Sequence, residues 1–251
     1  MVKSAVRVME ILELVCRNKT GLTQKEISKE LEIPKSSLSS ILTDMTSQKY
    51  LSMDQLTKQF SLGPKVLMLA GGYLENQDVA GPGRPLVARL SRETEESAAL
   101  AVRAGSDALI VYKEDCLQPI LPSIQIGSSF PLYASAAGKA MLAHDTDRDI
   151  HRYLESVDLL PLTKHTVTDK TQLLSELRAI RKGSPAYNRE GFREGITAIA
   201  APVFYHNGKV AAAISISALT IRLTTEKQSR IEDILTKVAI HFSGLLGYSP
   251  E

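Results

Sequence analysis

Two stretches near the start of the chain carry apolar residues at the spacing of one buried helix face. The positions follow i, i+3, i+4 and i+7 in both, with Val8, Ile11, Leu12 and Val15 in the first and Leu38, Ile41, Leu42 and Met45 in the second. This spacing places the side chains on one side of an α-helix. It predicts a helix over residues 4–17 and another that begins at Pro34, because proline suits the first turn of a helix.

A shorter helix is predicted between these two by its capping residues. Thr23 and Glu26 have the spacing of a capping box, and Leu22 and Ile27 stand where a hydrophobic staple holds the entry of a helix. We therefore expect a helix over residues 24–31. A tight turn between this helix and the next is typical of a helix-turn-helix, in which the second helix reads DNA.

The outward face of that second helix is small and polar. It presents Lys35, Ser36, Ser39, Ser40 and Thr43, and its first acidic residue is Asp44. Two short strands follow, at residues 50–53 and 58–62, and predict the hairpin wing of a winged helix-turn-helix. The same pattern also fits an interaction module of another kind, so it favours DNA binding without deciding it.

Beyond the wing, helical and strand spacings alternate. A helix that starts at Gly63-Pro64 is expected to end at the Gly- and Pro-rich residues 81–85, and it is the predicted linker. The later segments predict helices at residues 86–94, 136–143, 147–154, 171–182 and 224–246, and strands at residues 98–103, 109–112, 120–126, 196–204 and 209–217. A sheet covered by helices predicts an α+β fold.

Composition changes this picture little. The chain of 251 residues has 43% hydrophobic and 23% charged residues, as expected of a globular protein. It has no apolar stretch of membrane-spanning length and no signal-peptide core, so we expect a cytoplasmic protein without a membrane partner. Residues 1–75 hold 10 of the 30 Lys and Arg residues and 8 of the 28 Asp and Glu residues. So small an excess predicts a DNA interface that depends on where the charges point.

Several segments carry a resemblance to a known family. They are KSAVRVMEIL at residues 3–12, IPKSS at 33–37, FSLGPK at 60–65, PLYASAAGKAMLA at 131–143, GITAIAAPV at 195–203, ISIS at 214–217 and RLT at 222–224. In this order they resemble the IclR family of transcriptional regulators along nearly the whole chain. The resemblance implies a winged helix-turn-helix in residues 1–63, a linker helix in residues 64–83 and a GAF-like effector-binding domain in residues 84–251. It also implies dimers or tetramers that bind an inverted-repeat operator in double-stranded DNA and respond to a small effector, with repression as the expected outcome.

The residues expected to contact DNA lie in the helix-turn-helix and the wing. They are Arg7, Thr23, Lys35, Ser36, Ser37, Ser39, Ser40 and Lys58. The family often has a basic residue in the middle of the reading helix, where this chain has Ser39 and Ser40. Serine discriminates bases less well than arginine or lysine does. Lys35, Arg7 and Lys58 are therefore expected to bind phosphates, with a solvated cation as the alternative for each.

An effector site is expected in the second half of the chain. Ser215 and Ser217 lie two residues apart in an otherwise apolar strand, so both hydroxyls face one side of the sheet. They can bind a ligand carboxylate, or they can bond neighbouring backbone. The resemblance adds the further pocket residues Ala136, Ala137, Asn188, Ile196 and Ala198. Asn188 replaces an acidic residue of some relatives, and because an amide does not repel an anion, the effector is expected to be an organic acid. With no arginine assigned to the pocket, a hydrophobic or aromatic monocarboxylate is preferred to a small dicarboxylate.

Two other classes of function compete with a regulator. An enzyme is disfavoured, because no His-Glu-x-x-His or Gly-x-Ser-x-Gly motif occurs and Gly138-Lys139 lacks the upstream glycine of a phosphate-binding loop. We therefore expect no catalytic residue, metal or cofactor, and we prefer solvated histidines to a metal site at His144, Asp147 and His151. A ligand-sensing module that acts through protein partners stays open, since the reading helix lacks a central cation.

Overall fold

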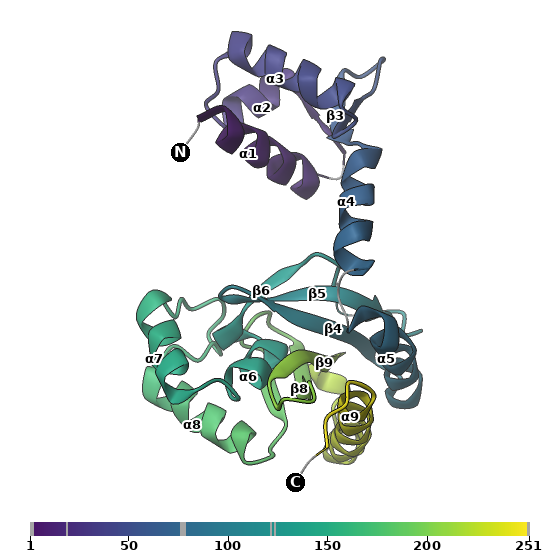
Figure 1. The fold of residues 1–251 in the computed structure, drawn as a ribbon, viewed down its shortest axis with the longest axis vertical. Coiled ribbons are helices and arrows are strands. Elements are labelled where there is room, and N and C mark those ends of the chain that lie inside the picture. The colour runs from purple at the N-terminus through teal and green to yellow at the C-terminus, as the bar shows by residue number, and fades with distance from the viewer. Residues whose placement is uncertain (1–2, 19, 76–78, 121, 123, 250–251) are drawn as a thin grey trace. The chain divides into compact units, whose positions relative to one another are not determined.

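The computed structural model describes residues 3–18, 20–75, 79–120, 122 and 124–249 (Figure 1). The chain divides into two compact units, residues 1–76 and residues 77–251. Each unit has its own helices and its own antiparallel sheet.

The N-terminal unit combines short helices with a small sheet. Its elements are α1 (Lys3–Arg17), β1 (Leu22–Thr23), α2 (Gln24–Glu30), α3 (Lys35–Ser47), β2 (Leu51–Met53), β3 (Gln59–Leu62) and α4 (Pro64–Glu75). The strand order is β1-β3-β2. The predicted helices are confirmed, and so is the wing, which β2 and β3 form. The sequence does not predict β1, which pairs with β3 through Leu22 and Phe60.

The predicted apolar stripes form the core of this unit. Its buried cluster includes Ile11, Val15, Ile27, Leu38, Leu42 and Met45. The capping box is also confirmed, since Thr23 Oγ1 accepts a hydrogen bond from Glu26 N at 3.4 Å and Glu26 Oε2 accepts one from Thr23 N at 2.7 Å. These bonds satisfy two backbone donors that the first turn of α2 would otherwise leave without partners. The helix therefore begins where the sequence predicts.

Gly63 joins the wing to α4 at a point where a side chain does not fit. Its N–H donates to the carbonyl of Tyr50 at 2.8 Å, and Lys65 N donates to the carbonyl of Lys49 at 3.0 Å. A Cβ on Gly63 would lie 2.2 Å from that Lys49 oxygen. Glycine therefore allows the wing and the first turn of α4 to approach this closely.

The C-terminal unit is a sheet covered by helices, as predicted. Its elements are α5 (Ala80–Thr94), β4 (Ser97–Ala104), β5 (Asp107–Glu114), β6 (Ser129–Pro131), η1 (Leu132–Ala134), α6 (Ala136–Leu142), α7 (Asp147–Ser156), α8 (Lys170–Arg181), β7 (Ala186–Arg189), β8 (Ile196–Phe204), β9 (Val210–Leu219), η2 (Thr220–Arg222) and α9 (Thr225–Leu245). The strand order is β6-β5-β4-β9-β8-β7, and every neighbouring pair is antiparallel.

Helices cover both faces of this sheet. On one face lie α5 and α9 (Figure 1). Gly83 of α5 packs close to Leu100 of β4 and Phe242 of α9. On the other face, apolar residues of α6, α7 and α8 share a core with strand residues such as Ala99 and Ala200. Because side chains alternate along a strand, neighbouring residues of β4, β8 and β9 face different sets of helices.

The predicted helix break at residues 81–85 is wrong. α5 begins at Ala80 and contains this segment, whereas the sequence predicts a helix start at Leu86. Gly83 N donates to Val79 O at 3.0 Å, and a Cβ on Gly83 would lie 2.8 Å from Leu100 Cδ2 and 2.9 Å from Phe242 Cζ. Close packing against the sheet and α9 therefore outweighs the low helix propensity of the segment. The expected linker, residues 64–83, covers α4, residues outside the described part of the chain, and the start of α5.

Two strand predictions also fail. The described residues within 120–126 form no strand, and the edge strand β6 comes later, at Ser129–Pro131. The strand β7 is absent from the prediction, because its length of 4 residues is too short to show an alternating pattern. Its pairing with β8 stabilises it.

Candidate DNA interface and ligand pocket

The polar face of α3 is exposed as predicted. Lys35, Ser36, Ser37, Ser39 and Ser40 are all exposed, and Leu38 and Leu42 are buried between them. The Lys35 ammonium has no ion-pair partner within the described part of the chain. This leaves one cation and a row of short hydroxyl side chains available for contact with a groove.

Two side-chain bonds fix the turn that precedes this face. Gln24 Nε2 donates to the carbonyl of Lys35 at 3.1 Å, and Ser28 Oγ donates to the carbonyl of Ile33 at 2.8 Å. Both donors belong to α2 and both acceptors to the start of α3 or the residues before it. The two helices of the helix-turn-helix are thus held at a fixed junction.

The wing ends in a turn that is organised by Asp54. Its Oδ1 accepts hydrogen bonds from Leu56 N at 2.9 Å and Thr57 N at 2.8 Å. Backbone hydrogen bonds from Thr57 and Leu56 lower the pKa of the Asp54 carboxyl, so the carboxylate is the form that the turn uses. Lys58 follows with a φ of +55° and is exposed, with its Nζ 3.4 Å from Gln55 Oε1. The turn therefore presents the predicted phosphate contact Lys58 at a defined position.

Arg7 and Thr23 differ from the other predicted contacts. Arg7 lies half-buried on α1, and it has no ion-pair partner among the residues that the structure describes. Thr23 Oγ1 donates to Glu26 Oε2 at 2.7 Å in addition to its capping bond, and the hydrogen bonds from Thr23 lower the pKa of Glu26. The structure thus gives the Thr23 hydroxyl a capping role, and its contact with DNA stays a prediction.

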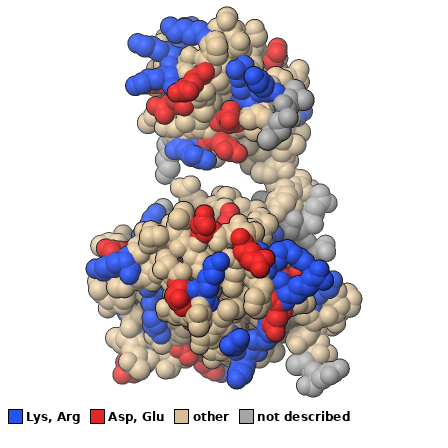
Figure 2. All heavy atoms as spheres, turned by 90° about the vertical axis from the view of Figure 1, so that its left-hand side faces the viewer, with Lys and Arg blue, Asp and Glu red and all other residues tan. Residues whose placement is uncertain are grey.

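Charge alone does not mark the interface. Figure 2 shows Lys and Arg side chains interspersed with Asp and Glu side chains on the face that it draws, in both units. This agrees with the small formal charge of +2. The position of Lys35 and Lys58, rather than a broad basic surface, distinguishes the helix-turn-helix and the wing.

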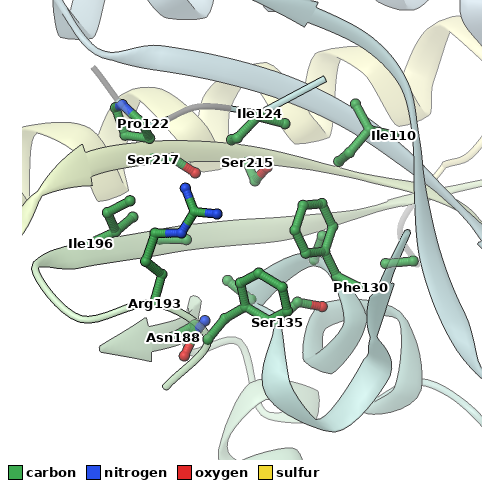
Figure 3. A pocket seen from close by; sticks show the side chains of 15 residues that line it. Ile110, Pro122, Ile124, Phe130, Ser135, Asn188, Arg193, Ile196, Ser215 and Ser217 are labelled. Atoms are coloured by element: carbon green, nitrogen blue, oxygen red, sulfur yellow. The ribbon is translucent and has the colours of Figure 1, made fainter. Parts of the chain in front are cut away.

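All predicted effector residues line one cavity of the C-terminal unit. Its volume is about 90 Å³. The predicted lining residues are Ala136, Ala137, Asn188, Ile196, Ala198, Ser215 and Ser217. The other lining residues, which were not predicted, are Ala108, Ile110, Pro122, Ile124, Phe130, Ser135, Phe192 and Arg193 (Figure 3).

The register of the sheet places the polar residues on one face of the sheet, which forms the floor of this pocket. Asn188 pairs with Ala198, Ala198 pairs with Ser217, and Ser217 pairs with Ser97. Directly paired residues of antiparallel strands point to the same face. Ala198 is small, so it leaves space between the Asn188 amide and the Ser217 hydroxyl. Ser215 lies in the next row of the same face, opposite Ala200.

The two predicted serines are without hydrogen-bond partners. Neither the Ser215 nor the Ser217 hydroxyl bonds any residue that the structure describes, although both residues are more than nine-tenths buried. The alternative that they bond neighbouring backbone is therefore not what the structure shows. A buried hydroxyl without a partner is costly unless a ligand or water satisfies it. The two hydroxyls thus mark the polar side of the cavity.

Asn188 and Ser135 have different bonding states. Asn188 Oδ1 accepts from Gly191 N at 3.0 Å, which fixes the amide and leaves its NH₂ group available to an acceptor in the cavity. Ser135 Oγ accepts from Gly138 N at 3.1 Å and donates to Pro131 O at 3.0 Å. The hydroxyl of Ser135 is therefore used in capping α6, whereas Asn188 can donate to an anion.

Arg193 corrects the expectation that the pocket holds no arginine. It lies in the loop between β7 and β8, and its guanidinium points toward Ser217 (Figure 3). Arg193 is not predicted from the sequence because β7 is not predicted, and without β7 the position of this loop is undefined. The sequence contains one signal for this residue, namely an arginine between Gly191 and Gly195, directly before the strand predicted at residues 196–204.

The remaining wall of the cavity is apolar. Phe130 and Phe192 meet edge to face, with ring centroids 4.8 Å apart and an interplanar angle of 81°. Ile110 and Ile124 also line the cavity (Figure 3). Apolar walls with a few convergent polar groups are typical of small-molecule sites.

Other kinds of site find no support in the described residues. Within residues 3–18, 20–75, 79–120, 122 and 124–249, no three His, Cys, Asp or Glu side chains lie close enough to hold a metal ion. His151 Nδ1 lies 2.7 Å from the carbonyl of Asp147, one turn earlier in α7. No helix in the described part of the chain is long and apolar enough to cross a membrane.

Comparison with known families assigns both units. The model of the IclR helix-turn-helix domain matches residues 4–55, and the model of the bacterial transcriptional regulator IclR C-terminal domain matches residues 71–243. The chain belongs to the IclR family of transcriptional regulators. The predicted fold, an N-terminal helix-turn-helix followed by an α+β domain compatible with a GAF-like fold, is thus confirmed.

Individual relatives agree over nearly the full length. The HTH-type transcriptional regulator BhcR of Paracoccus denitrificans is 29% identical over 96% of this chain and 86% of its own length. The HTH-type transcriptional repressor AllR of Salmonella typhimurium is 27% identical over 97% of this chain and 90% of its own length. The crystal structure of the Thermotoga maritima IclR protein has a TM-score of 0.83 and 25% identity, covering 99% of this chain and 100% of that chain. The protein is therefore a DNA-binding transcriptional regulator and not an enzyme.

Proposed function

We propose that this IclR-family regulator is a repressor that binds an inverted-repeat operator. Its affinity for the operator changes when a small organic acid occupies the pocket of the C-terminal unit. In this proposal residues 1–63 bind DNA, residues 64–83 link the units and residues 84–251 bind the effector. One observation carries the effector part. The hydroxyls of Ser215 and Ser217 face a cavity beside the free NH₂ group of Asn188, and no described residue satisfies them.

The DNA part of the proposal rests on α3 and the wing. The exposed face of α3 carries short hydroxyl side chains that can enter a major groove, and Lys35 supplies the positive charge at its start. Serine contacts to bases are weakly discriminating, so phosphate contacts by Lys35 and Lys58 contribute much of the affinity. The binding of this regulator to DNA should therefore weaken steeply as salt concentration rises.

An even-numbered oligomer follows from the geometry of operator recognition and from α4. One helix-turn-helix reads a half-site, so an inverted repeat requires two copies of the chain. On α4, Leu67, Met68, Leu69 and Tyr73 are 76%, 70%, 56% and 44% exposed. Large exposed apolar residues gathered on one helix favour burial against a partner. We propose that α4 contributes to a homodimer, which can pair further into a tetramer.

Repression is proposed by analogy. AllR is named a transcriptional repressor, and this chain is similar to it over nearly its whole length. A ligand changes operator affinity only if it binds one of two protein conformations more tightly than the other. The pocket of the C-terminal unit supplies such a ligand site.

A direct test uses DNA from upstream of the coding sequence. Fluorescence anisotropy should detect tight binding to a fragment that holds an inverted repeat and at least tenfold weaker binding to the same fragment with one half-site scrambled. Small organic acids of the neighbouring pathway should alter the first affinity and leave binding to random DNA unchanged. A stable monomer that binds the fragment specifically would contradict the oligomer, and failure to bind any upstream fragment would favour a module that acts through protein partners.

A further inference from the structure

We infer that Arg193 is the counter-ion of the effector carboxylate and that it restricts the pocket to small monocarboxylates with an apolar body. The inference rests on the proposed effector function of this pocket. It goes further by assigning the carboxylate to one side chain, and it bases the preference for a monocarboxylate on the presence of this arginine rather than on the lack of one.

Arg193 is the one charged residue among the described residues that line the cavity. Its guanidinium points toward Ser217 (Figure 3), and it has no hydrogen bond or ion pair with any described residue. Some other arginines of this unit are paired with carboxylates, as Arg152 is with Asp149 and Arg222 with Glu96, whereas Arg193 lines the cavity. A guanidinium aimed into a cavity without an internal partner is available for an anionic ligand.

The acidic neighbours of Arg193 are engaged elsewhere. Glu194 Oε1 lies 3.9 Å from Lys164 Nζ. Glu190 Oε2 accepts a hydrogen bond from Gly195 N at 2.8 Å, and this bond lowers the pKa of the Glu190 carboxyl. The two nearest carboxylates in the sequence therefore do not neutralise Arg193. A ligand carboxylate does not compete with them for its guanidinium.

The loop holds the backbone of Arg193 in place. Ile196 N donates to the carbonyl of Arg193 at 3.2 Å, and Glu190 N donates to the carbonyl of Ile196 at 3.0 Å. From outside the loop, Thr163 Oγ1 donates to Glu190 O at 2.8 Å and Thr166 Oγ1 donates to Gly191 O at 2.6 Å. A braced loop reduces the entropy lost when Arg193 binds a ligand.

The distribution of polar groups sets the ligand class. A guanidinium binds one carboxylate with two parallel hydrogen bonds, and Ser217, Ser215 and Asn188 offer neutral hydrogen-bonding groups beside it. Toward Phe130 and Ile110 the cavity is apolar. A second carboxylate placed there would be desolvated without a cation, which is unfavourable. The volume of about 90 Å³ further restricts the ligand to a small acid.

The test is a calorimetric titration of the full-length protein with defined probes. The panel comprises the straight-chain acids from acetate to pentanoate, isobutyrate and benzoate, the matching primary amides, and the dicarboxylates malonate and succinate. At least one monocarboxylate should bind the wild-type protein at least tenfold more tightly than its amide and than either dicarboxylate. Arg193→Met should weaken that acid by about tenfold to a hundredfold, and Arg193→Lys should retain part of the affinity because it keeps the charge but loses the bidentate geometry.

Lys209→Met is the matched control. It removes an exposed cation from the turn between β8 and β9, at the other end of these strands from Arg193, and acid affinity should stay unchanged. Equal binding of the acid to wild type and Arg193→Met, equal binding of acid and amide, tighter binding of a dicarboxylate, or no binding of any acid in the panel would each overturn the inference.

The operator assay distinguishes this failure from that of the proposed function. If an acid shifts operator affinity equally in wild type and Arg193→Met, the regulator function holds and the role of Arg193 is wrong. If the wild-type protein binds no upstream DNA, the proposed function fails whatever the titration shows.

Discussion

Arg222 donates to both carboxylate oxygens of Glu96, with Nε 2.9 Å from Oε1 and Nη2 2.6 Å from Oε2. Glu96 is fully buried directly before β4, and Lys227 Nζ lies 2.6 Å from the same Oε1. Arg222 Nη1 also donates to the carbonyl of Ile120 at 2.7 Å. The hydrogen bonds with Glu96 raise the pKa of Arg222. One arginine thus compensates the buried charge of Glu96 and also anchors the backbone of Ile120.

Arg222→Met should therefore destabilise the C-terminal unit. The substitution leaves the buried carboxylate of Glu96 with Lys227 alone, and breaking a buried ion pair costs about 3 kcal/mol in the free energy of unfolding. Urea denaturation at neutral pH measures this cost. Arg152→Met is the control, because Arg152 and Asp149 form an exposed pair whose loss should cost far less. Equal stability losses for the two variants would show that Glu96 does not depend on Arg222.

The double substitution Ser215→Ala and Ser217→Ala should abolish the effector response. Each hydroxyl that bonds a carboxylate contributes about 1.5–3 kcal/mol, so ligand affinity should fall by about two orders of magnitude or more. Thermal unfolding without ligand should stay close to wild type, because neither hydroxyl bonds a described residue. Calorimetry with the effector measures the loss, and Ser184→Ala, an exposed hydroxyl outside this cavity, is the control. Wild-type affinity in the double variant would remove this strand face from the ligand site.

Lys35→Ala should weaken DNA binding in one of two recognisable ways. If Lys35 contacts a phosphate, affinity for operator and random DNA should fall alike and the salt dependence should decrease by about one released counter-ion. If it contacts a base, one operator position should become less restricted. Anisotropy titrations at several salt concentrations separate these outcomes, with Lys182→Ala in the C-terminal unit as control. Unchanged binding to both DNAs would exclude Lys35 from the interface.

His144 should make the protein less stable in mild acid. Its Nε2 is a buried nitrogen without a hydrogen-bond partner in the described structure, and the ring packs edge to face on Phe204. Burial and, next, Arg181 lower its pKa from the ordinary 6.5, with Asp145 acting in the opposite direction. Below about pH 6.5, His144 is therefore protonated in the unfolded chain. In the folded protein it stays neutral until the pH reaches its lower folded-state pKa.

Between pH 6.5 and the folded-state pKa of His144, the free energy of unfolding should fall by about 1.4 kcal/mol for each unit by which the pH is lowered. The loss should level off below the folded-state pKa. His144→Leu should remove this part of the acid destabilisation, and thermal unfolding between pH 7.5 and pH 5 measures it. A variant whose melting temperature declines as steeply as that of wild type would assign the pH dependence to other groups.

Two glycines of α5 should respond in opposite ways to alanine. A Cβ on Gly83 would press on Leu100 and Phe242, so Gly83→Ala should cost about 1–3 kcal/mol through overpacking. A Cβ on Gly81 meets nothing within 4 Å, and alanine there should be neutral or slightly stabilising because of its helix propensity. Chemical denaturation of both variants is the measurement. Equal effects would contradict the close packing of α5 on the sheet.

Sequence patterns predict the helices and strands that depend on their own residues rather than on contacts with distant parts of the chain. The capping box of Thr23 and Glu26 and the long, mostly apolar strand at residues 196–204 are local patterns, and both are confirmed. The start of α5 was not predictable, because the glycine at position 83 is required by close packing against Leu100 and Phe242. These residues lie 17 and 159 positions away along the chain. Local propensity does not include such contacts.

The pocket was predictable in part for the same reason. Alternation shows that Ser215 and Ser217 share a face, and the family resemblance supplies Asn188 and the alanines. The place of Arg193 depends on β7, a strand that exists through its pairing with β8. No pattern in residues 186–195 reveals that pairing. The sequence therefore does not predict Arg193, the one charged residue among the described residues that line the pocket.

Side chains of β8 and β9 point alternately to the two faces of the sheet, so different residues of each strand line the pocket and pack the core. Ala198 and Ser217 form the pocket floor, whereas their chain neighbours Ile199 and Ile216 point to the face that α5 and α9 cover. If the pocket holds the effector as proposed, substitutions at the floor positions should change which ligand is bound without disturbing the packing on the opposite face. Ligand preference could then change while the sheet stays equally stable.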